Sequence, residues 1–183
     1  MSTRIHPRVV LRRESPNQSS RNGATPRLIT IHSTESENRP GVSDLQATAG
    51  WLCSTPAAAS SHVIVDADAQ SARLVSDSRK AWTQAWFNPW CLSIEQIGRA
   101  AQKEWERDEL RETARWVARW SLMHDIPPYK AKVDLASGRI LRAGVIRHSE
   151  LGARGGNHHD PGAGYPMDKM LALARFYRAR LKG

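Results

Sequence analysis

The sequence predicts an α/β fold in which a central, mostly mixed β-sheet is flanked by helices within a single domain. Short apolar runs rich in β-branched residues come early in the chain, and helical and strand patterns then alternate. The chain has 183 residues, which suffices for one compact domain with its own hydrophobic core. Its hydrophobic content of 40% and its charged content of 25% are ordinary for a globular protein.

Apolar β-branched runs that are bounded by turn residues predict the strands of this sheet. The strands are expected over residues 28–31, 61–66, 72–75 and 92–97. The first run ends in His32-Ser33-Thr34, and residues 67–70 stand where a hairpin turn would join the second strand to the third. The second and third strands are therefore expected to form a β-hairpin.

Apolar residues at helical spacing predict three helices. The first covers about 43–53 and follows a Pro-Gly turn at 40–41, the second covers about 105–124, and the last covers about 167–181. The two prolines at 127–128 forbid continuation of the second helix, because proline lacks the amide donor. The charged face of this helix is expected to point outward, with Arg111, Glu112, Arg115 and Arg119.

Residues 1–26 are predicted to be a flexible basic segment, and the ordered domain is predicted to cover 27–183. The stretch 14–26 is rich in Ser, Asn, Gly and Pro and contains few apolar residues. An alternative stays open for one part of this segment, because Val9, Val10 and Leu11 suit a short edge strand.

The net charge of +9 is concentrated at the two ends of the chain. Residues 1–27 carry +5, residues 168–183 carry +4, and the stretch between them is neutral. A basic surface favours binding of polyanions such as nucleic acid or teichoic acid. The alternative is that these charges simply lie in solvent, on a tail and on one face of a helix. We expect no nucleic-acid partner, because the centre is neutral and no RNA-binding or zinc-finger motif is present.

Export and membrane insertion are not expected from this sequence. No apolar run approaches the about 20 residues of a membrane helix, and residues 1–10 lack the apolar core of a secretory signal. We therefore expect synthesis in a cytoplasm. Cys53 and Cys91 lack CxxC spacing and are interpreted as buried thiols rather than zinc ligands.

Histidines stand where several predicted strands end or loops turn. His32 closes the first strand, His148 follows an apolar run, and His158-His159-Asp160 lies in a glycine-rich loop. Two histidines and one aspartate would suffice for a catalytic zinc site, which keeps three protein ligands. Spacing alone leaves a second reading open, in which these loop histidines are plain surface groups.

A set of motifs resembles the type 2 N-acetylmuramoyl-L-alanine amidase family, which includes phage endolysins, wall-recycling bacterial amidases and peptidoglycan recognition proteins. The resemblance covers about 27–166, and the motifs occur in the family's order. They are LITIHST, ASSHVIVDADA, AWTQAWFN followed by CLSIEQIG, IRHSEL, and HHDPG.

The resemblance implies a set of site residues. His32 and His148 correspond to the family's zinc histidines, and Asp160 corresponds to the third ligand immediately before Pro-Gly. Glu95 occupies the position of a catalytic glutamate on a central strand. His158 stands where the family often has a lysine, and we expect it to donate a hydrogen bond to an oxyanion. The zinc site is expected at one edge of the sheet.

Substrate contacts are expected from Ser61, His62, Trp86 and Asn88. Ser61 replaces a tyrosine that phage members place before the second strand's histidine, and His62 is interpreted as a residue of the site wall or the core. The tryptophans gather around the strands, and we expect some in the core and others along a groove that stacks on sugar or peptide. The sequence does not distinguish among Trp51, Trp82, Trp86 and Trp90.

The resemblance thus implies that residues 27–183 form an amidase catalytic domain that uses Zn²⁺ to cut the lactyl–L-alanine amide bond of bacterial peptidoglycan. The expected setting is a monomeric phage endolysin in the host cytoplasm, which reaches the wall after holin-type permeabilisation of the membrane. The alternative is a non-catalytic peptidoglycan-binding protein of the same fold. Loss of the third ligand usually marks such proteins, so the presence of Asp160 favours the enzyme.

Overall fold

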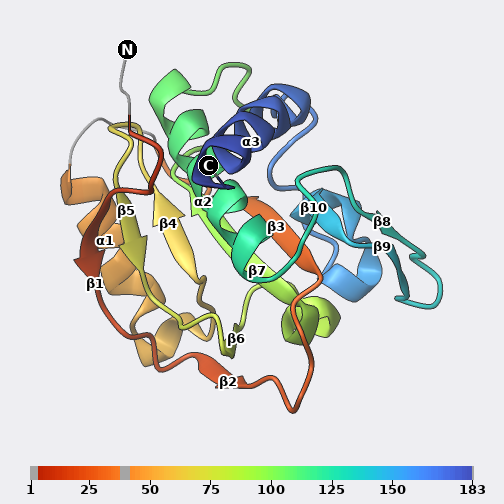
Figure 1. Cartoon of the computed structure of the whole chain (residues 1–183). Coiled ribbons are helices and arrows are strands. Elements are labelled where there is room, and N and C mark those ends of the chain that lie inside the picture. The colour runs from red at the N-terminus through yellow and green to blue at the C-terminus, as the bar shows by residue number, and fades with distance from the viewer. Residues whose placement is uncertain (1–3, 38–41, 183) are drawn as a thin grey trace.

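The computed structural model describes residues 4–37 and 42–182, and Figure 1 shows a central sheet with helices packed against it. The Pro-Gly turn predicted at 40–41 lies outside these described residues. Within the described part of the chain, no helix is both long and apolar enough to cross a bilayer.

The central sheet has six strands in the order β1-β5-β4-β7-β3-β10. β4 and β5 are antiparallel, whereas the other neighbouring strands are parallel, so the predicted mixed sheet and the predicted hairpin are confirmed. The strands are β1 (Val9–Arg12), β3 (Leu28–Ser33), β4 (Val63–Val65), β5 (Ser71–Arg73), β7 (Cys91–Gln96) and β10 (Gly144–Arg147).

Smaller elements surround the sheet. Two short antiparallel pairs join β2 (Gln18–Ser20) to β6 (Arg79–Ala81) and β8 (Lys132–Val133) to β9 (Ile140–Arg142). The single-turn and short 3₁₀ segments are η1 (Thr55–Ala57), η2 (Ala85–Trp90), η3 (His148–Glu150) and η4 (Ala153–Gly155).

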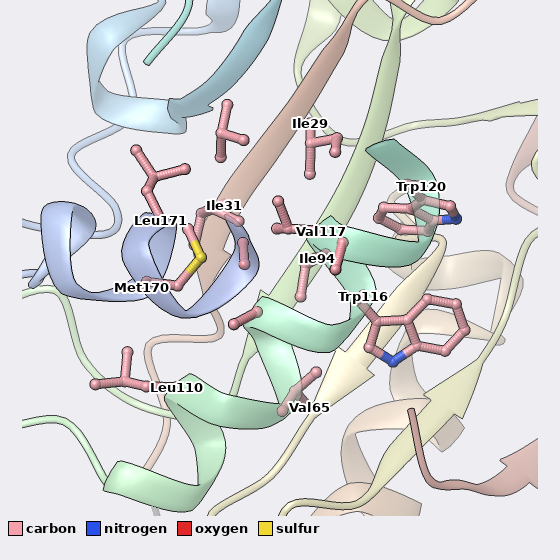
Figure 2. Close-up of a cluster of buried hydrophobic side chains, with 14 of the residues drawn as sticks. Ile29, Ile31, Val65, Ile94, Leu110, Trp116, Val117, Trp120, Met170 and Leu171 are labelled. Carbon is pink, nitrogen blue, oxygen red and sulfur yellow. The ribbon is translucent and has the colours of Figure 1, made fainter. Parts of the chain in front are cut away.

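The helices cover opposite faces of the sheet, and their positions agree with the predicted spans. They are α1 (Val42–Leu52), α2 (Arg107–Met123) and α3 (Met167–Lys182). Ile29, Ile31 and Ile94 pack against α2 and α3 in one buried cluster (Figure 2). Because side chains alternate along a strand, the intervening positions of β3 and β7 face the side of the sheet that α1 covers. His32 and Glu95 occupy such positions.

The described part of the N-terminal segment, residues 4–26, contributes two strands to the fold, whereas the sequence predicted a flexible segment there. β1 pairs in parallel with β5, as the edge-strand alternative proposed, and β2 pairs with β6. Ser15 and Asn17 are buried, and the Ser15 hydroxyl donates to the Leu52 carbonyl at 2.6 Å. Polar residues that suggested a solvated linker are instead used to hydrogen-bond the backbone of α1 and the loop after it.

Glu112 and Arg115 of α2 are also placed differently from the prediction. Arg119 is exposed as expected, but Glu112 and Arg115 are 0% and 1% exposed. The cause is the N-terminal segment, which crosses this face of α2. Arg4 lies 2.8 Å from the Glu112 carboxylate, and the guanidinium of Arg115 lies 3.1 Å from it.

We expect Glu112→Ala to lower the free energy of unfolding by about 3–5 kcal/mol, because it leaves the buried Arg115 guanidinium without its counter-charge. Urea unfolding measures the change. Asp108→Ala is the matched control, since it removes an exposed ion pair with Arg111 on the same helix and is expected to cost under about 1 kcal/mol. Equal losses in the two variants would show that residues 4–8 do not cover α2 in solution.

Candidate metal and active site

Three parallel strands bring the polar side chains of the site to one edge of the sheet. His32 lies near the end of β3, Glu95 is its register partner on β7, and His148 follows directly after β10. The carboxyl ends of parallel neighbours meet at the same edge, so residues more than a hundred positions apart become adjacent. The rings of His32 and His148 are 4.4 Å apart between centroids.

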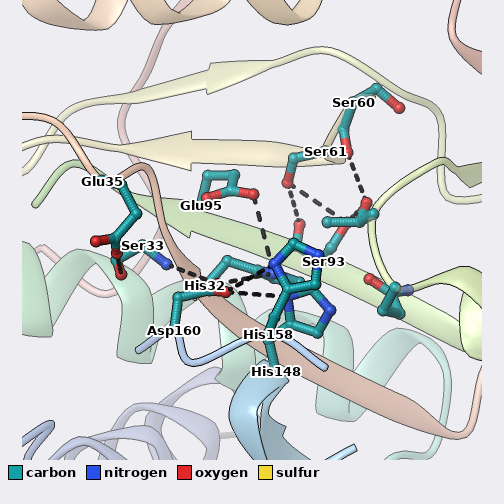
Figure 3. A network of polar contacts seen from close by, with 12 residues as sticks. His32, Ser33, Glu35, Ser60, Ser61, Ser93, Glu95, His148, His158 and Asp160 are labelled. Carbon is teal, nitrogen blue, oxygen red and sulfur yellow. Dashed lines mark hydrogen bonds and ion pairs between the residues drawn. The ribbon is translucent and has the colours of Figure 1, made fainter. Parts of the chain in front are cut away.

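Asp160 reaches the two histidines from the glycine-rich loop that follows η4 (Figure 3). Its Oδ2 is 3.3 Å from His32 Nδ1, and its Oδ1 is 3.3 Å from His148 Nδ1. The backbone amide of Ser33 donates to Oδ2 at 3.3 Å and holds the carboxylate in place. The candidate ligand atoms of the three residues all lie within 4.8 Å of one another, and all three side chains are buried.

The hydrogen bonding of His148 suits a bound cation. Its Nε2 lies 2.8 Å from the carbonyl oxygen of Gly155, which only accepts, so Nε2 must carry a proton. In a neutral imidazole, Nδ1 then presents a lone pair to the Asp160 carboxylate. Two acceptors at this separation require a second proton or a metal ion between them. The donor set therefore fits a cation held by two imidazole nitrogens and a carboxylate oxygen.

Burial sets the charge states of the site. It lowers the pKa of His32 to about 4, so this imidazole is neutral and has a lone pair available at neutral pH. Burial alone would raise the pKa of Asp160, but contacts with His148 and His32 hold it well below its usual range, and the carboxylate is ionised. Neutral imidazole and ionised carboxylate are the forms that bind metals.

Glu95 lies beside the three candidate ligands without joining them. Its Oε1 is 3.9 Å from His32 Nδ1, and its side chain is 13% exposed. Its Oε2 has no hydrogen-bond partner among the described residues. Burial, followed by the negative charges of Asp160 and Glu35, raises the pKa of Glu95 well above its usual value. This carboxylate therefore has an oxygen free to receive a hydrogen bond from a molecule in the site.

His158 and His159 diverge, as expected for neighbours in an extended loop. His158 stacks on His148 at 4.1 Å between ring centroids, and its Nδ1 is 3.3 Å from Asp160 Oδ1. His159 instead points to Glu35, with 3.5 Å between Nε2 and Oε2. His158 is therefore the one of the pair that contacts the candidate ligands.

A cavity of about 260 Å³ opens over these residues. None of Ser61, His62, Trp86 and Asn88 lines it, so the structure does not support the substrate contacts predicted for them. Ser61 and His62 are fully buried because β4 continues a sheet that is covered on both faces. The Ser61 hydroxyl donates to the Ser93 carbonyl at 3.0 Å.

The remaining predicted contacts have structural partners. His62 Nε2 is 2.9 Å from the buried guanidinium of Arg21, and burial lowers the pKa of His62 to about 3. The Asn88 carboxamide oxygen accepts from the backbone amides of Thr83 and Gln84 at the start of η2. Trp86 is exposed, and the Arg154 guanidinium lies over its ring. Asn88 shapes the loop that contains Thr83, a residue that does line the cavity.

The cavity also contains residues that the sequence did not single out. Glu35 lies two residues beyond β3, where its carboxylate accepts from the Ala100 amide at 2.8 Å. Trp51 at the end of α1 and Trp82 after β6 line the cavity, which resolves the ambiguity among the tryptophans. The clustering of tryptophans in the sequence indicated a groove, but residue patterns do not show which of the tryptophans share a cavity.

The fold and the site together define an α/β protein with a candidate mononuclear metal centre of two histidines and one aspartate. Residues 22–163 match the model of the family described as N-acetylmuramoyl-L-alanine amidase, and the chain belongs to this family.

Solved structures share the fold. The Staphylococcus aureus hydrolase AmiA in complex with its ligand has a TM-score of 0.68 and 18% identity, over 97% of this chain and 86% of that chain. A selenomethionine derivative of AmpD has a TM-score of 0.65 and 16% identity, over 89% of this chain and 93% of that chain. LysC, an N-acetylmuramoyl-L-alanine amidase from Clostridium intestinale, has a TM-score of 0.62 and 13% identity, over 92% of this chain and 98% of that chain. A comparison with curated proteins finds no match.

Proposed function

We propose that this chain is a zinc-dependent N-acetylmuramoyl-L-alanine amidase that hydrolyses the lactyl–L-alanine amide bond of bacterial peptidoglycan. The observation that carries the proposal is the buried cluster of His32, His148 and Asp160 inside a cavity, with the Glu95 carboxylate beside it. The family match supports the same activity.

The donor set favours zinc among the common metal ions. Magnesium and calcium take mainly oxygen ligands, whereas zinc is bound by imidazole nitrogen and carboxylate oxygen. Three protein ligands are the number typical of catalytic zinc sites. When bound, zinc would lower the pKa of water toward about 7 and polarise the amide carbonyl.

We assign to Glu95 the two proton transfers of the reaction, from the attacking water and to the leaving amine. Its oxygen without a hydrogen-bond partner accepts a proton from the attacking water, and the same carboxyl group later returns that proton. The water oxygen bonds to the lactyl carbonyl carbon, and the bond from that carbon to nitrogen breaks. The L-alanine nitrogen takes the proton and leaves as a free amine.

We assign to His158 the hydrogen bond that stabilises the developing oxyanion. We expect His158→Ala to lower kcat by about 10²–10³ with the zinc content unchanged, because one oxyanion donor is lost while the ligands stay in place. His159→Ala is the matched control in the same loop and is expected to cost little, since His159 points to Glu35. Steady-state kinetics together with metal analysis test the pair. If the two variants behave the other way round, His159 is the donor and the assignment is off by one residue.

The bond that is cut is tested by digesting purified peptidoglycan. We expect new L-alanine amino termini and no new reducing sugar ends, because a metal ion held by His32, His148 and Asp160 would activate water and polarise an amide carbonyl. New reducing ends would overturn the proposed reaction. Binding to peptidoglycan without release of any product by the zinc-loaded protein would favour the non-catalytic alternative.

The biological setting stays a prediction of the sequence. We propose that the chain acts as a monomeric phage endolysin that is made in the host cytoplasm and reaches the wall through a holin-permeabilised membrane. Expression in a susceptible bacterium is expected to cause lysis only when a holin is co-expressed. Lysis without a holin would contradict this route, and light scattering of the purified protein tests the monomeric state.

A further inference from the structure

The cavity beside the candidate ligands has two chemically different halves. One half contains its ionisable side chains, which come from β3, β7, η3 and the glycine-rich loop: His32, Glu35, Glu95, His148, His158, His159 and Asp160. The other half comes from α1, the loop after η1 and the loop after β6, and none of its lining residues is charged: Thr48, Trp51, Leu52, Ala59, Ser60, Trp82 and Thr83.

The uncharged half exposes two indole rings. Trp51 is 60% exposed and Trp82 is 39% exposed, although both border a cavity. Leaving large aromatic surfaces in water is unfavourable, and apolar surfaces of this kind mark ligand or partner sites when they line a concave region. Single exposed aromatic residues are common elsewhere on proteins, but these two share one cavity with a candidate catalytic centre.

Trp82 is held in place by the N-terminal segment. Its indole Nε1 donates to the Ser19 hydroxyl of β2 at 3.0 Å, and its backbone amide donates to the Ser60 hydroxyl at 3.0 Å. The Ser60 hydroxyl in turn donates to the Asn17 carbonyl.

The same segment supports the rest of this half of the cavity. The Asn17 carboxamide donates to the carbonyls of Ser54 and Ala59 at 2.8 and 2.9 Å. Thr83 donates to the Ser60 carbonyl at 2.6 Å. These bonds restrain the loop that carries Trp82 and the loop that follows α1 before any ligand binds, which reduces the entropy cost of binding.

We propose that Trp51 and Trp82 form a subsite for the N-acetylhexosamine ring of the substrate, with the stem peptide placed along the ionisable half. This inference rests on the proposed function and names the part of the substrate that each half of the cavity binds. The sugar ring is uncharged and has an apolar face, which suits an uncharged aromatic surface. The stem peptide has carboxylates and an amino group, which suit the polar and ionisable side chains of this half, such as His158 and Glu35.

Two substrates that differ only in the sugar test this assignment. One is a muramyl tetrapeptide, and the other is a D-lactyl tetrapeptide with the same stem and no sugar ring. Wild-type protein is expected to have the lower KM for the muramyl compound. Trp82→Ala and Trp51→Ala are each expected to raise KM for that compound roughly tenfold and to leave KM for the lactyl compound nearly unchanged.

Conservative and control variants separate recognition from stability. Trp82→Phe keeps an aromatic ring but lacks the donor to Ser19, so an intermediate KM is expected. Phe176→Ala removes a similarly exposed aromatic ring on α3, outside the cavity, and is expected to change neither KM. Circular dichroism and thermal unfolding establish that each variant is folded.

Binding of the disaccharide N-acetylglucosaminyl-N-acetylmuramic acid, followed by tryptophan fluorescence, gives a readout that does not need hydrolysis. Binding to wild type that is weakened roughly tenfold in Trp82→Ala supports the subsite. Equal KM losses for the muramyl and lactyl substrates would overturn the sugar assignment in favour of the peptide. Disaccharide binding without hydrolysis of either substrate would refute the proposed function and leave the subsite standing.

Discussion

His32→Ala is expected to remove the bound zinc and to lower kcat/KM by at least about 10³-fold, because two remaining ligands hold the ion poorly and its Lewis acidity is worth several kcal/mol. Elemental analysis of the purified variant, together with the peptidoglycan digest, measures both effects. Chelation of the wild type is expected to abolish activity in the same way, and added zinc is expected to restore it.

The control for this experiment is His6→Ala, which removes an exposed histidine outside the cavity and is expected to leave one zinc per chain. Activity that survives complete removal of zinc would refute the metal-dependent reaction. Zinc retained at full stoichiometry in His32→Ala would show that the ion binds elsewhere, with His158 as the first residue to test because its Nδ1 already contacts Asp160.

Glu95→Gln is expected to lower kcat by about 10²–10⁴ with zinc content and fold unchanged, because an amide of the same shape cannot accept the proton of the attacking water. The change also replaces a carboxyl group whose ionisation is disfavoured by burial and by the Asp160 and Glu35 carboxylates with a group that does not ionise. We therefore expect the variant to be as stable as the wild type or more stable, which thermal unfolding measures at matched zinc content.

The combination of lower kcat with undiminished stability is the result that distinguishes a catalytic Glu95 from a structural one. Glu95→Asp is the conservative companion, because it keeps the carboxylate but shortens its reach, and partial activity is expected. Full activity in Glu95→Gln would contradict the assigned role. Loss of both activity and stability would indicate that Glu95 mainly supports β7.

The sequence by itself was sufficient to place the three helices and four strands of the central sheet, β3, β4, β5 and β7, but it did not predict β10 or the two short strand pairs. The strand at residues 28–31 and the helix at 105–124 have strong apolar periodicity, and both are confirmed as β3 and α2. The three candidate ligands were also identified from the sequence, but only because the motifs resemble a family. Spacing carries no information about the contact between His32 and His148, which depends on the parallel pairing of β3 with β10.

Tertiary structure decided the features that depend on contacts between distant segments. The polar stretch at 14–26 has the composition of a linker, yet Asn17 is buried because carbonyl groups of another loop lie within reach. Glu112 has the position of a surface residue on α2, yet it is buried because Arg4 crosses that face. Local patterns report the periodicity of one segment, whereas burial depends on which other segment covers it.

The same distinction applies to the cavity. Four tryptophans near the strands were equivalent in sequence, and only the packing of α1 and the β2–β6 pair shows that Trp51 and Trp82 share the cavity while Trp86 lies outside it. The chemistry available to the chain was therefore determined by its residue types and their order. Which of those residues meet was decided by strand register and by the N-terminal segment, because both are set by long-range pairing rather than by local sequence.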